Sequence, residues 1–262
     1  MNDFDLDARF LAAQDVARDG GRLALRHFRN RDALTVEMKG AQDMVSKADR
    51  EVEALIHGRL SMHFPGDGFL GEEGGASDGT SGGLWVVDPI DGTAGFVVGI
   101  PVWCVSIAFV AGDEIEIGVV YDPNADEMFA TRRGRGAGLN GAPIRASTAM
   151  SLDEGTVGIG YSPRTGPRPA VAAIERLLDA GGMYQCNGSC ALALAYVAGG
   201  RLIGYYEAHI FSWDCLAGIA LVRETGGWTN DFLAGDGLMR GNPIIVAAPG
   251  LEDAMKNVAG VA

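Results

Sequence analysis

The sequence is poor in cysteine and has no long apolar run. Only four cysteines occur in 262 residues. Cys186 and Cys190 are four positions apart, but no second Cys/His pair completes a zinc site, so we expect free thiols. No apolar stretch reaches about 18 residues without a charged or turn residue, which argues against a membrane-spanning helix. The acidic start MNDFDLDARF lacks the basic-then-apolar pattern of a signal peptide. We therefore expect a cytoplasmic protein.

Positive charge is also scarce. The chain has 21 Lys and Arg residues against 34 Asp and Glu residues, a formal net charge of −13, and no basic stripe offsets it. Such a surface repels nucleic acid and anionic membranes, so we expect neither as a partner. An acidic protein can still bind an anionic phosphate ester if divalent cations lie between the two.

The remaining composition is typical of a globular protein. Hydrophobic residues make up 47% and charged residues 21% of the chain, which is enough apolar material for a sizeable core. The length suits one compact unit with two lobes. The 39 glycines are roughly double the usual share and follow no short period, which indicates tight turns and close backbone approaches.

The predicted elements change in character along the chain. The first part reads as two helices followed by strands, which predicts helices packed on a largely antiparallel sheet; the helices span 5–28 and 48–63, and the strands lie near 68–70, 84–87, 102–110, 115–121 and 128–131. In the second part, strands near 156–161, 202–206, 227–229 and 243–247 alternate with helices near 168–180, 189–198 and 213–224. We place an N-terminal α+β lobe at 1–148 and a C-terminal α/β lobe at 149–262.

The segment Asp88-Pro89-Ile90-Asp91-Gly92-Thr93 follows an apolar strand. Pro89 fixes a bend, so Asp88 and Asp91 can face the same side of the strand end. Two carboxylates at a buried edge repel, and a cation relieves that repulsion. Gly92 permits a close backbone approach, and Thr93 can open a helical turn whose N–H groups face an anion. The alternative is a plain Asp-Pro turn with an Asx cap.

Two further acidic segments stand beside apolar runs. In Gly71-Glu72-Glu73, one glutamate can face inward and one outward; the alternative is a solvated acidic loop. Trp213-Asp214 opens a helix of small and apolar residues, where an aspartate can equally be a simple N-terminal cap.

The order of these three motifs resembles the inositol monophosphatase family, a group of magnesium-dependent, lithium-sensitive phosphatases related to fructose bisphosphatases. A Gly-Glu-Glu turn, an Asp-Pro-Ile-Asp-Gly-Thr segment about 15 residues later and a distant Trp-Asp pair are all present. The resemblance runs from about Lys39 to Asn242-Pro243. It implies a layered αβαβα sandwich, a dimer, and hydrolysis of a small phosphate monoester by metal-activated water.

The resemblance also implies a set of oxygen ligands for two to three Mg²⁺ ions, with Mn²⁺ as an alternative. Glu72, Asp88 and the carbonyl of Ile90 correspond to the ligands of one ion. Asp88, Asp91 and Asp214 correspond to those of a second, and Glu72 would also hold a weaker third ion. Oxygen ligands alone favour a hard cation over zinc.

Catalytic roles follow from the same resemblance. Glu72 and Thr93 match the residues that position the attacking water, and Asp49 matches an acid that hydrogen-bonds behind the threonine. Asp49 is equally acceptable as a helix-stabilising acid in a first turn. The N–H groups of Gly92 and Thr93 would bind phosphate oxygens. Lys39 is a candidate residue near the site, with an ordinary surface lysine as the alternative.

Substrate selection is expected from the second lobe. Ser189 matches a residue that contacts the sugar ring or phosphate, and Glu207 matches an acid that accepts hydrogen bonds from substrate hydroxyls. Asp91 and Asp214 are expected beside the substrate, Asp214 near the leaving-group oxygen. The sequence departs from inositol-specific relatives at Tyr161, Gln185 and Gly95, which bears on the substrate and leaves the ligand set complete.

Several functions stay open at this point. A polyol or sugar phosphate such as inositol monophosphate is favoured, with histidinol phosphate as an alternative. A 3′-phosphonucleotide needs basic residues for its second phosphate, and only Arg164 and Arg168 are near. A regulatory binding protein that keeps the fold without activity is the alternative from another class, although its ligand set should then be eroded.

Overall fold

The computed structural model describes residues 2–30, 36–40 and 43–261, and for 36–40 and 43–46 it describes the backbone alone. Eight α-helices occur in this part of the chain: α1 Asp3–Arg29, α2 Lys47–His63, α3 Thr93–Val98, α4 Arg168–Asp179, α5 Cys190–Ala198, α6 Ser212–Glu224, α7 Gly237–Arg240 and α8 Glu252–Ala259.

The larger of the two main sheets has eight strands in the order β10-β9-β8-β7-β6-β5-β3-β4, and all neighbours are antiparallel except β3 and β5. Its strands are β3 Gly68–Gly71, β4 Gly75–Ser77, β5 Gly83–Asp91, β6 Cys104–Ala111, β7 Glu114–Asp122, β8 Glu127–Arg132, β9 Ala137–Leu139 and β10 Ala142–Pro143. A separate hairpin pairs β1 Val36–Gly40 with β2 Asp43–Ser46.

The smaller sheet has five strands in the order β12-β11-β13-β15-β14. They are β11 Thr156–Ile159, β12 Met183–Gln185, β13 Gly204–Ile210, β14 Trp228–Thr229 and β15 Asn242–Ala247. Strand β11 runs parallel to β12 and β13, whereas β15 is antiparallel to its two neighbours.

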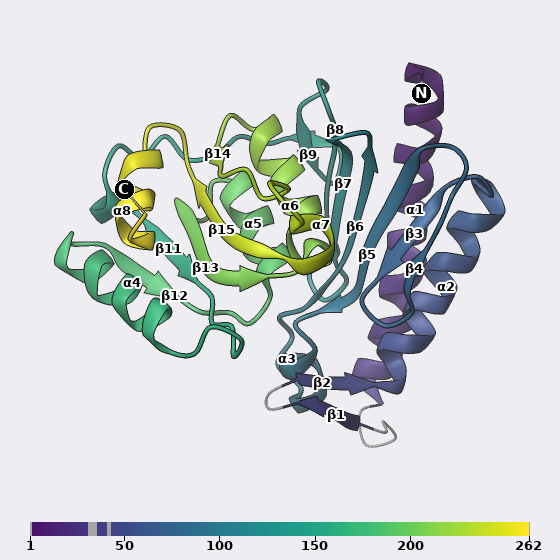
Figure 1. Ribbon diagram of the computed structural model, residues 1–262, viewed down its shortest axis with the longest axis horizontal. Coiled ribbons are helices and arrows are strands. Elements are labelled where there is room, and N and C mark those ends of the chain that lie inside the picture. The colour runs from purple at the N-terminus through teal and green to yellow at the C-terminus, as the bar shows by residue number, and fades with distance from the viewer. Residues whose placement is uncertain (1, 31–35, 41–42, 262) are drawn as a thin grey trace.

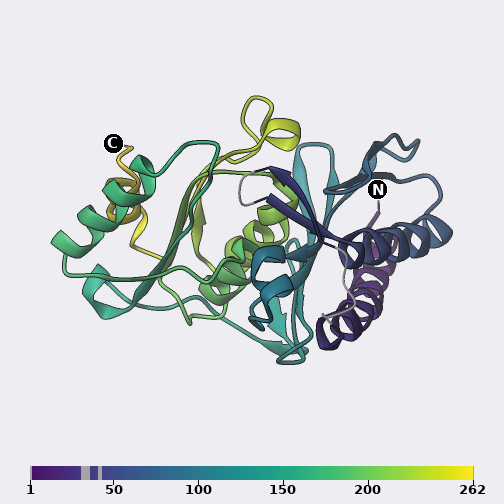
Figure 2. The same ribbon diagram turned by 90° about the horizontal axis from the view of Figure 1, so that it is seen from below.

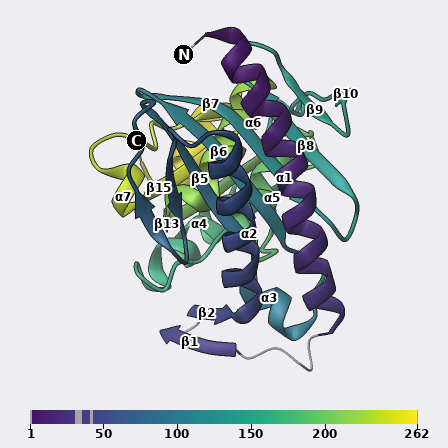
Figure 3. The same cartoon turned by 90° about the vertical axis from the view of Figure 1, so that its right-hand side faces the viewer.

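The helices form three layers around the two sheets. Helices α1 and α2 lie side by side on the outer face of the large sheet (Figures 1 and 3). Helices α5 and α6 lie between the sheets (Figures 1 and 2), and α4 and α8 cover the far face of the small sheet. This arrangement is an αβαβα sandwich, so the fold implied by the family resemblance is confirmed.

The middle layer is apolar on almost every side because it has a sheet on each face. Eight of the nine residues of α5 are buried, a pattern that only a fully enclosed helix can tolerate. Two glycines allow the close packing: a Cβ at Gly218 would collide with Leu194 of α5, and a Cβ at Gly118 would collide with the Ala217 carbonyl of α6. The N-terminus of α6 is thereby held firmly against the large sheet.

The sequence-based element predictions agree with this structure for the long elements. The prediction of a strand at 202–206 is wrong at its C-terminal end, because β13 continues to Ile210 and therefore includes Glu207. Helix α8 and the short strands β4, β9, β10 and β12 were not predicted, whereas β14 agrees with the strand predicted at 227–229. The large sheet ends at Pro143 and the small sheet begins at Thr156; the division into lobes at 148/149 stays a prediction. All four cysteines are free, as predicted, and no described helix is long and apolar enough to cross a bilayer.

Candidate active site

A β-bulge brings Asp88 and Asp91 to one place. Asp88 pairs with Ser106 of β6 and Asp91 pairs with Cys104, so three steps along β5 match two steps along β6. In a regular strand, residues three apart point to opposite faces. The extra residue changes that alternation, which lets both carboxylates join one cluster. Both aspartates are buried, Asp88 at 2% and Asp91 at 6% exposure.

Asp214 reaches the same cluster from the first turn of α6. The Ser106 hydroxyl donates a hydrogen bond to the carbonyl of Trp213 at 3.0 Å and so ties the start of α6 to β6. One carboxylate oxygen from each of Asp88, Asp91 and Asp214 lies within 4.8 Å of the other two. Three acidic residues from sequence positions 88 to 214 therefore meet at one point, as the sequence predicted.

Each of the three carboxylates is oriented through one oxygen. The N–H of Ile90 donates to Asp88 Oδ1 at 2.9 Å, and the N–H of Phe211 donates to Asp214 Oδ2 at 2.8 Å. Asp91 Oδ2 accepts from the Ser189 hydroxyl at 2.5 Å and from the N–H of Ala191 at 2.7 Å.

The second oxygen of each aspartate accepts no protein hydrogen bond within the described residues. Three oriented carboxylate oxygens, two of them from buried aspartates and one from the half-buried Asp214, suit a hard divalent cation such as Mg²⁺. The residues present therefore fit the metal that the resemblance implies.

The electrostatics of the cluster point the same way. No Lys or Arg of the described chain forms an ion pair with Asp88, Asp91 or Asp214. Burial, followed by the charge of Glu72, raises the pKa of Asp88 well above its usual range. Burial, followed by the charge of Asp91, does the same to the pKa of Asp214. Burial raises the pKa of Asp91 to about 6, although its hydrogen bonds oppose the change. The cluster is costly when ionised without a counter-charge.

Glu72 lies beside this cluster at the end of β3. It is half-buried, its N–H donates to the Val87 carbonyl of β5 at 3.3 Å, and its charge acts on both Asp88 and Asp214. Sequence reasoning missed Glu53, a buried residue of α2 that orders this turn. The Glu53 carboxylate accepts from the N–H groups of Glu73 at 2.8 Å and Gly74 at 2.6 Å. An acid next to Val52 on the apolar face of a predicted helix was the available signal.

Thr93 links the strand end to α2. Its hydroxyl lies 3.0 Å from Asp49 Oδ1 and 2.9 Å from the Ile90 carbonyl, and Asp49 is buried in the first turn of α2. The preceding Gly92 has φ +102°, and a Cβ there would lie 2.8 Å from the Val102 carbonyl. Only glycine suits this position, which begins α3.

A cavity of about 310 Å³ adjoins the carboxylates, and Asp91 and Asp214 form part of its wall. Glu207 lines it from β13, where the Tyr205 hydroxyl donates to its Oε2 at 2.6 Å. Burial raises the pKa of Glu207 to about 7. Tyr161 also lines the cavity. The site thus combines an acidic cluster with a pocket of small-molecule size.

Two predicted residues differ from the others, because Ser189 is absent from the cavity wall and the Lys39 side chain is not described. Ser189 is buried and does not line the cavity. Its hydroxyl donates a hydrogen bond to Asp91 and accepts one from the N–H of Leu192. The Ser189 hydroxyl therefore supports Asp91, and its contact with the substrate stays a prediction. Lys39 is on β1, where side chains lie outside the described part, so its candidate role stays a prediction.

The structure is thus an αβαβα sandwich of the α/β class, with converging carboxylates that could hold a metal ion beside a small cavity. The model of the inositol monophosphatase family matches residues 5–259. The chain belongs to the inositol monophosphatase family.

Named relatives fall into two groups. The chain is 37% identical over 244 residues to the Nus factor SuhB of Escherichia coli, covering 92% of this chain and 91% of that protein. It is also 37% identical over 245 residues to the inositol-1-monophosphatase of Mesorhizobium japonicum, with the same coverage.

Solved structures of this fold are similar over nearly the whole chain. The extragenic suppressor protein suhB of Bartonella henselae has a TM-score of 0.91 and 33% identity, covering 96% of this chain and 98% of that one. Inositol monophosphate-bound SaIMPase-II has a TM-score of 0.77 and 26% identity, covering 97% and 92%.

Proposed function

We propose that this protein is a Mg²⁺-dependent phosphatase that hydrolyses a small phosphate monoester. The observation that supports this most is the meeting of three oriented carboxylates, each with one oxygen left open, at the wall of a cavity. Asp88, Asp91 and Asp214, with Glu72 and the carbonyl of Ile90, would hold the ions. When bound, Mg²⁺ lowers the pKa of water and screens phosphate charge.

Thr93 and Glu72 would orient the attacking water. The Thr93 hydroxyl has one proton and lies within hydrogen-bond distance of Asp49. When it donates that proton to Asp49, a lone pair of Oγ1 remains to accept a hydrogen bond from water. Glu72 would accept the second hydrogen bond from the same water. Asp49 therefore acts through Thr93 as a positioning residue.

The substrate would lie with its phosphate at the start of α3 and its organic part in the cavity. The N–H groups of Gly92 and Thr93, which precede the first internal hydrogen bonds of the helix, would bind phosphate oxygens. Asp214, on the cavity wall, would face the ester oxygen, and Asp91 would line the substrate side of the cluster.

A polyol or sugar phosphate is the substrate that this cavity favours. Its volume of about 310 Å³ suits a monosaccharide-sized group. Glu207 can accept hydrogen bonds from two neighbouring hydroxyls. The relative SaIMPase-II was solved with inositol monophosphate. Histidinol phosphate is an alternative. A 3′-phosphonucleotide is less favoured, because its second phosphate needs basic residues and no Lys or Arg is among the described residues that line the cavity.

A regulatory binding role is the second candidate, because the relatives called Nus factor SuhB carry a name that does not refer to phosphatase activity. We further propose a cytoplasmic homodimer that binds neither nucleic acid nor membranes. Sedimentation velocity tests the dimer, and retardation assays with RNA and DNA test the absence of a nucleic-acid partner.

The deciding experiment measures phosphate release from a panel of polyol, sugar, histidinol and nucleotide monophosphates, with Mg²⁺ and with EDTA. We expect release that depends on Mg²⁺, with the highest kcat/KM for a polyol phosphate. Asp214→Asn should abolish release while the exposed Asp113→Asn control remains active. A folded wild-type protein that releases no phosphate from any ester would refute the phosphatase and favour the binding role.

A further inference from the structure

A second cavity of the described chain is separate from the candidate active site. It has a volume of about 830 Å³ and lies between the start of α1, the β8–β9 turn and the C-terminal end of α6. Four arginines line it against two acids: Arg132, Arg135, Arg145, Arg223, Asp7 and Glu224. A positive cavity is unexpected in a chain with a net charge of −13.

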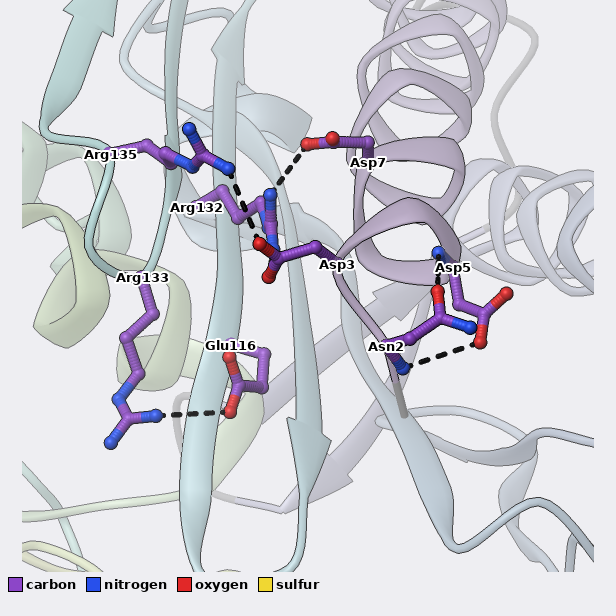
Figure 4. Close-up of polar contacts among 8 residues, drawn as sticks. All are labelled: Asn2, Asp3, Asp5, Asp7, Glu116, Arg132, Arg133 and Arg135. Atoms are coloured by element: carbon purple, nitrogen blue, oxygen red, sulfur yellow. Dashed lines mark hydrogen bonds and ion pairs between the residues drawn. The ribbon is translucent and has the colours of Figure 1, made fainter.

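The two acids of this cavity are already engaged. Both oxygens of Glu224 accept backbone N–H bonds at 2.8 Å, from Gly134 and Gly136. Asp7 accepts from Arg132 at 2.7 Å. Figure 4 shows Asp7 and Asp3 of α1 facing Arg132, with Arg135 beside them. The negative charges of Asp3 and Asp7 therefore offset the positive charge of Arg132 and only part of that of Arg135.

Two of the arginines have no carboxylate partner within the described residues. Arg223 donates through Nε to the neutral hydroxyl of Thr229 at 2.9 Å. Arg145 forms neither an ion pair nor a side-chain hydrogen bond with the described part of the chain. Both side chains are exposed, so they are accessible to a ligand that enters the cavity.

Arg132 supplies an independent observation. Its side chain is only 4% exposed, and its buried Nε–H group has no hydrogen-bond acceptor in the described structure. Buried N–H groups of native proteins are nearly always paired, with protein, water or a ligand. Arg132 therefore keeps a donor that Asp3 and Asp7 leave unpaired, and the guanidinium forks of the exposed Arg145 and Arg223 are well suited to phosphate or carboxylate oxygens.

We propose that this cavity binds a small organic phosphate, at a site distinct from the catalytic one. The arginines favour a doubly charged phosphate group, whereas Phe10, Pro143 and Ile144 on the same wall favour an apolar body attached to it. The volume lies in the range of small-molecule sites, about 300–1,000 Å³.

Phenylphosphonate is a suitable probe, because it combines a phosphonate dianion with an apolar ring and is not a phosphate ester. Binding is measured by isothermal titration calorimetry on the full chain in EDTA. EDTA removes metal ions, so the acidic cluster of the candidate active site does not attract the anionic probe. We expect saturable 1:1 binding that weakens with added NaCl. Arg145→Ala and Arg223→Ala should each weaken binding by about tenfold or more, as expected for loss of a charge-assisted hydrogen bond.

Arg133→Ala is the matched control. Arg133 is on the same turn but pairs with Glu114 and Glu116, each at 3.3 Å, and Figure 4 shows it directed away from the Arg132 group. This variant removes the same charge and should bind phenylphosphonate with wild-type affinity. No saturable binding by wild type at millimolar probe, or an equal loss in Arg133→Ala and Arg145→Ala, would overturn the proposal. Because the experiment excludes Mg²⁺, its failure leaves the phosphatase proposal unaffected.

Discussion

Replacing Asp214 with asparagine should have opposite effects on stability without and with Mg²⁺. Asp214 shares a space with Asp88 and Asp91 in which carboxylate oxygens lie within 4.8 Å of one another. Two ionised carboxylates at that distance repel by about 3.5 kcal/mol at an effective dielectric constant of about 20. Protonation relieves part of this, because burial raises the pKa of all three groups. We therefore expect Asp214→Asn to stabilise the metal-free protein by about 1–3 kcal/mol.

With bound Mg²⁺, wild type should be more stable than Asp214→Asn. An ion at a hundred times its dissociation constant stabilises the native state by about 2.7 kcal/mol. For a chain of this size that raises Tm by about 5–10 °C. Asp214→Asn keeps the oxygen that accepts from the N–H of Phe211 but loses a charged ligand, so most of this increment should disappear.

Differential scanning calorimetry at pH 8, in EDTA and in saturating Mg²⁺, gives both comparisons. Asp113→Asn is the control, because Asp113 is exposed in the turn between β6 and β7 and should change neither condition by more than about 0.5 kcal/mol. The reasoning fails if Asp214→Asn keeps the full Mg²⁺ shift, or if it is less stable than wild type in EDTA at this pH.

Three further outcomes follow from the same geometry. Thr93→Val should lower kcat by about a hundredfold while Mg²⁺ affinity in calorimetry stays near wild type; equal losses in both would show that Thr93 supports the metal instead of the water. Ser189→Ala removes the 2.5 Å hydrogen bond to Asp91 and should weaken Mg²⁺ binding by about 10–100-fold. In EDTA, the free energy of unfolding should be highest at the low end of the pH range in which the protein is folded. The folded-state pKa is raised to about 6 for Asp91 and to about 7 for Glu207. Their protonated forms therefore contribute stability that is fully present below the unfolded pKa values and is lost as the pH rises through the folded ones. A Tm in EDTA that increases from pH 5 to pH 8 would contradict this sign.

The long elements of the fold could be predicted because their periodicity is local. Helices α1 and α2 and strands β5 to β8 each contain enough apolar residues at regular spacing to be recognised. Helix α8 spans only eight residues and buries Met255, Val258 and Ala259, too few for a clear period. Strands β10 and β12 have two and three residues and form only by pairing with a neighbour, so they leave no local signal.

The candidate site was predictable at the level of motifs, and its supporting contacts were not. The resemblance identified the acidic residues, but the bulge that brings Asp88 and Asp91 together depends on the register between β5 and β6. The same holds for Ser189 and Glu53, whose partners lie 98 and 20 positions away. Residue type alone could not tell that Ser189 holds a carboxylate while Glu207 faces a cavity.

The cost of collecting these carboxylates explains where the fold places them. The dipole of α6 favours an acid in its first turn by only about 0.3–1 kcal/mol, well below the repulsion of about 3.5 kcal/mol for one ionised pair. Neither hydrogen bonds nor helix position can therefore keep all three groups charged. The repulsion that remains must be offset by a bound cation or, without one, by protonation. The enclosed packing of α6 around Gly118 and Gly218 prevents the acids from separating. The closely packed middle layer thus keeps mutually repelling carboxylates together, in an arrangement that a metal ion could stabilise.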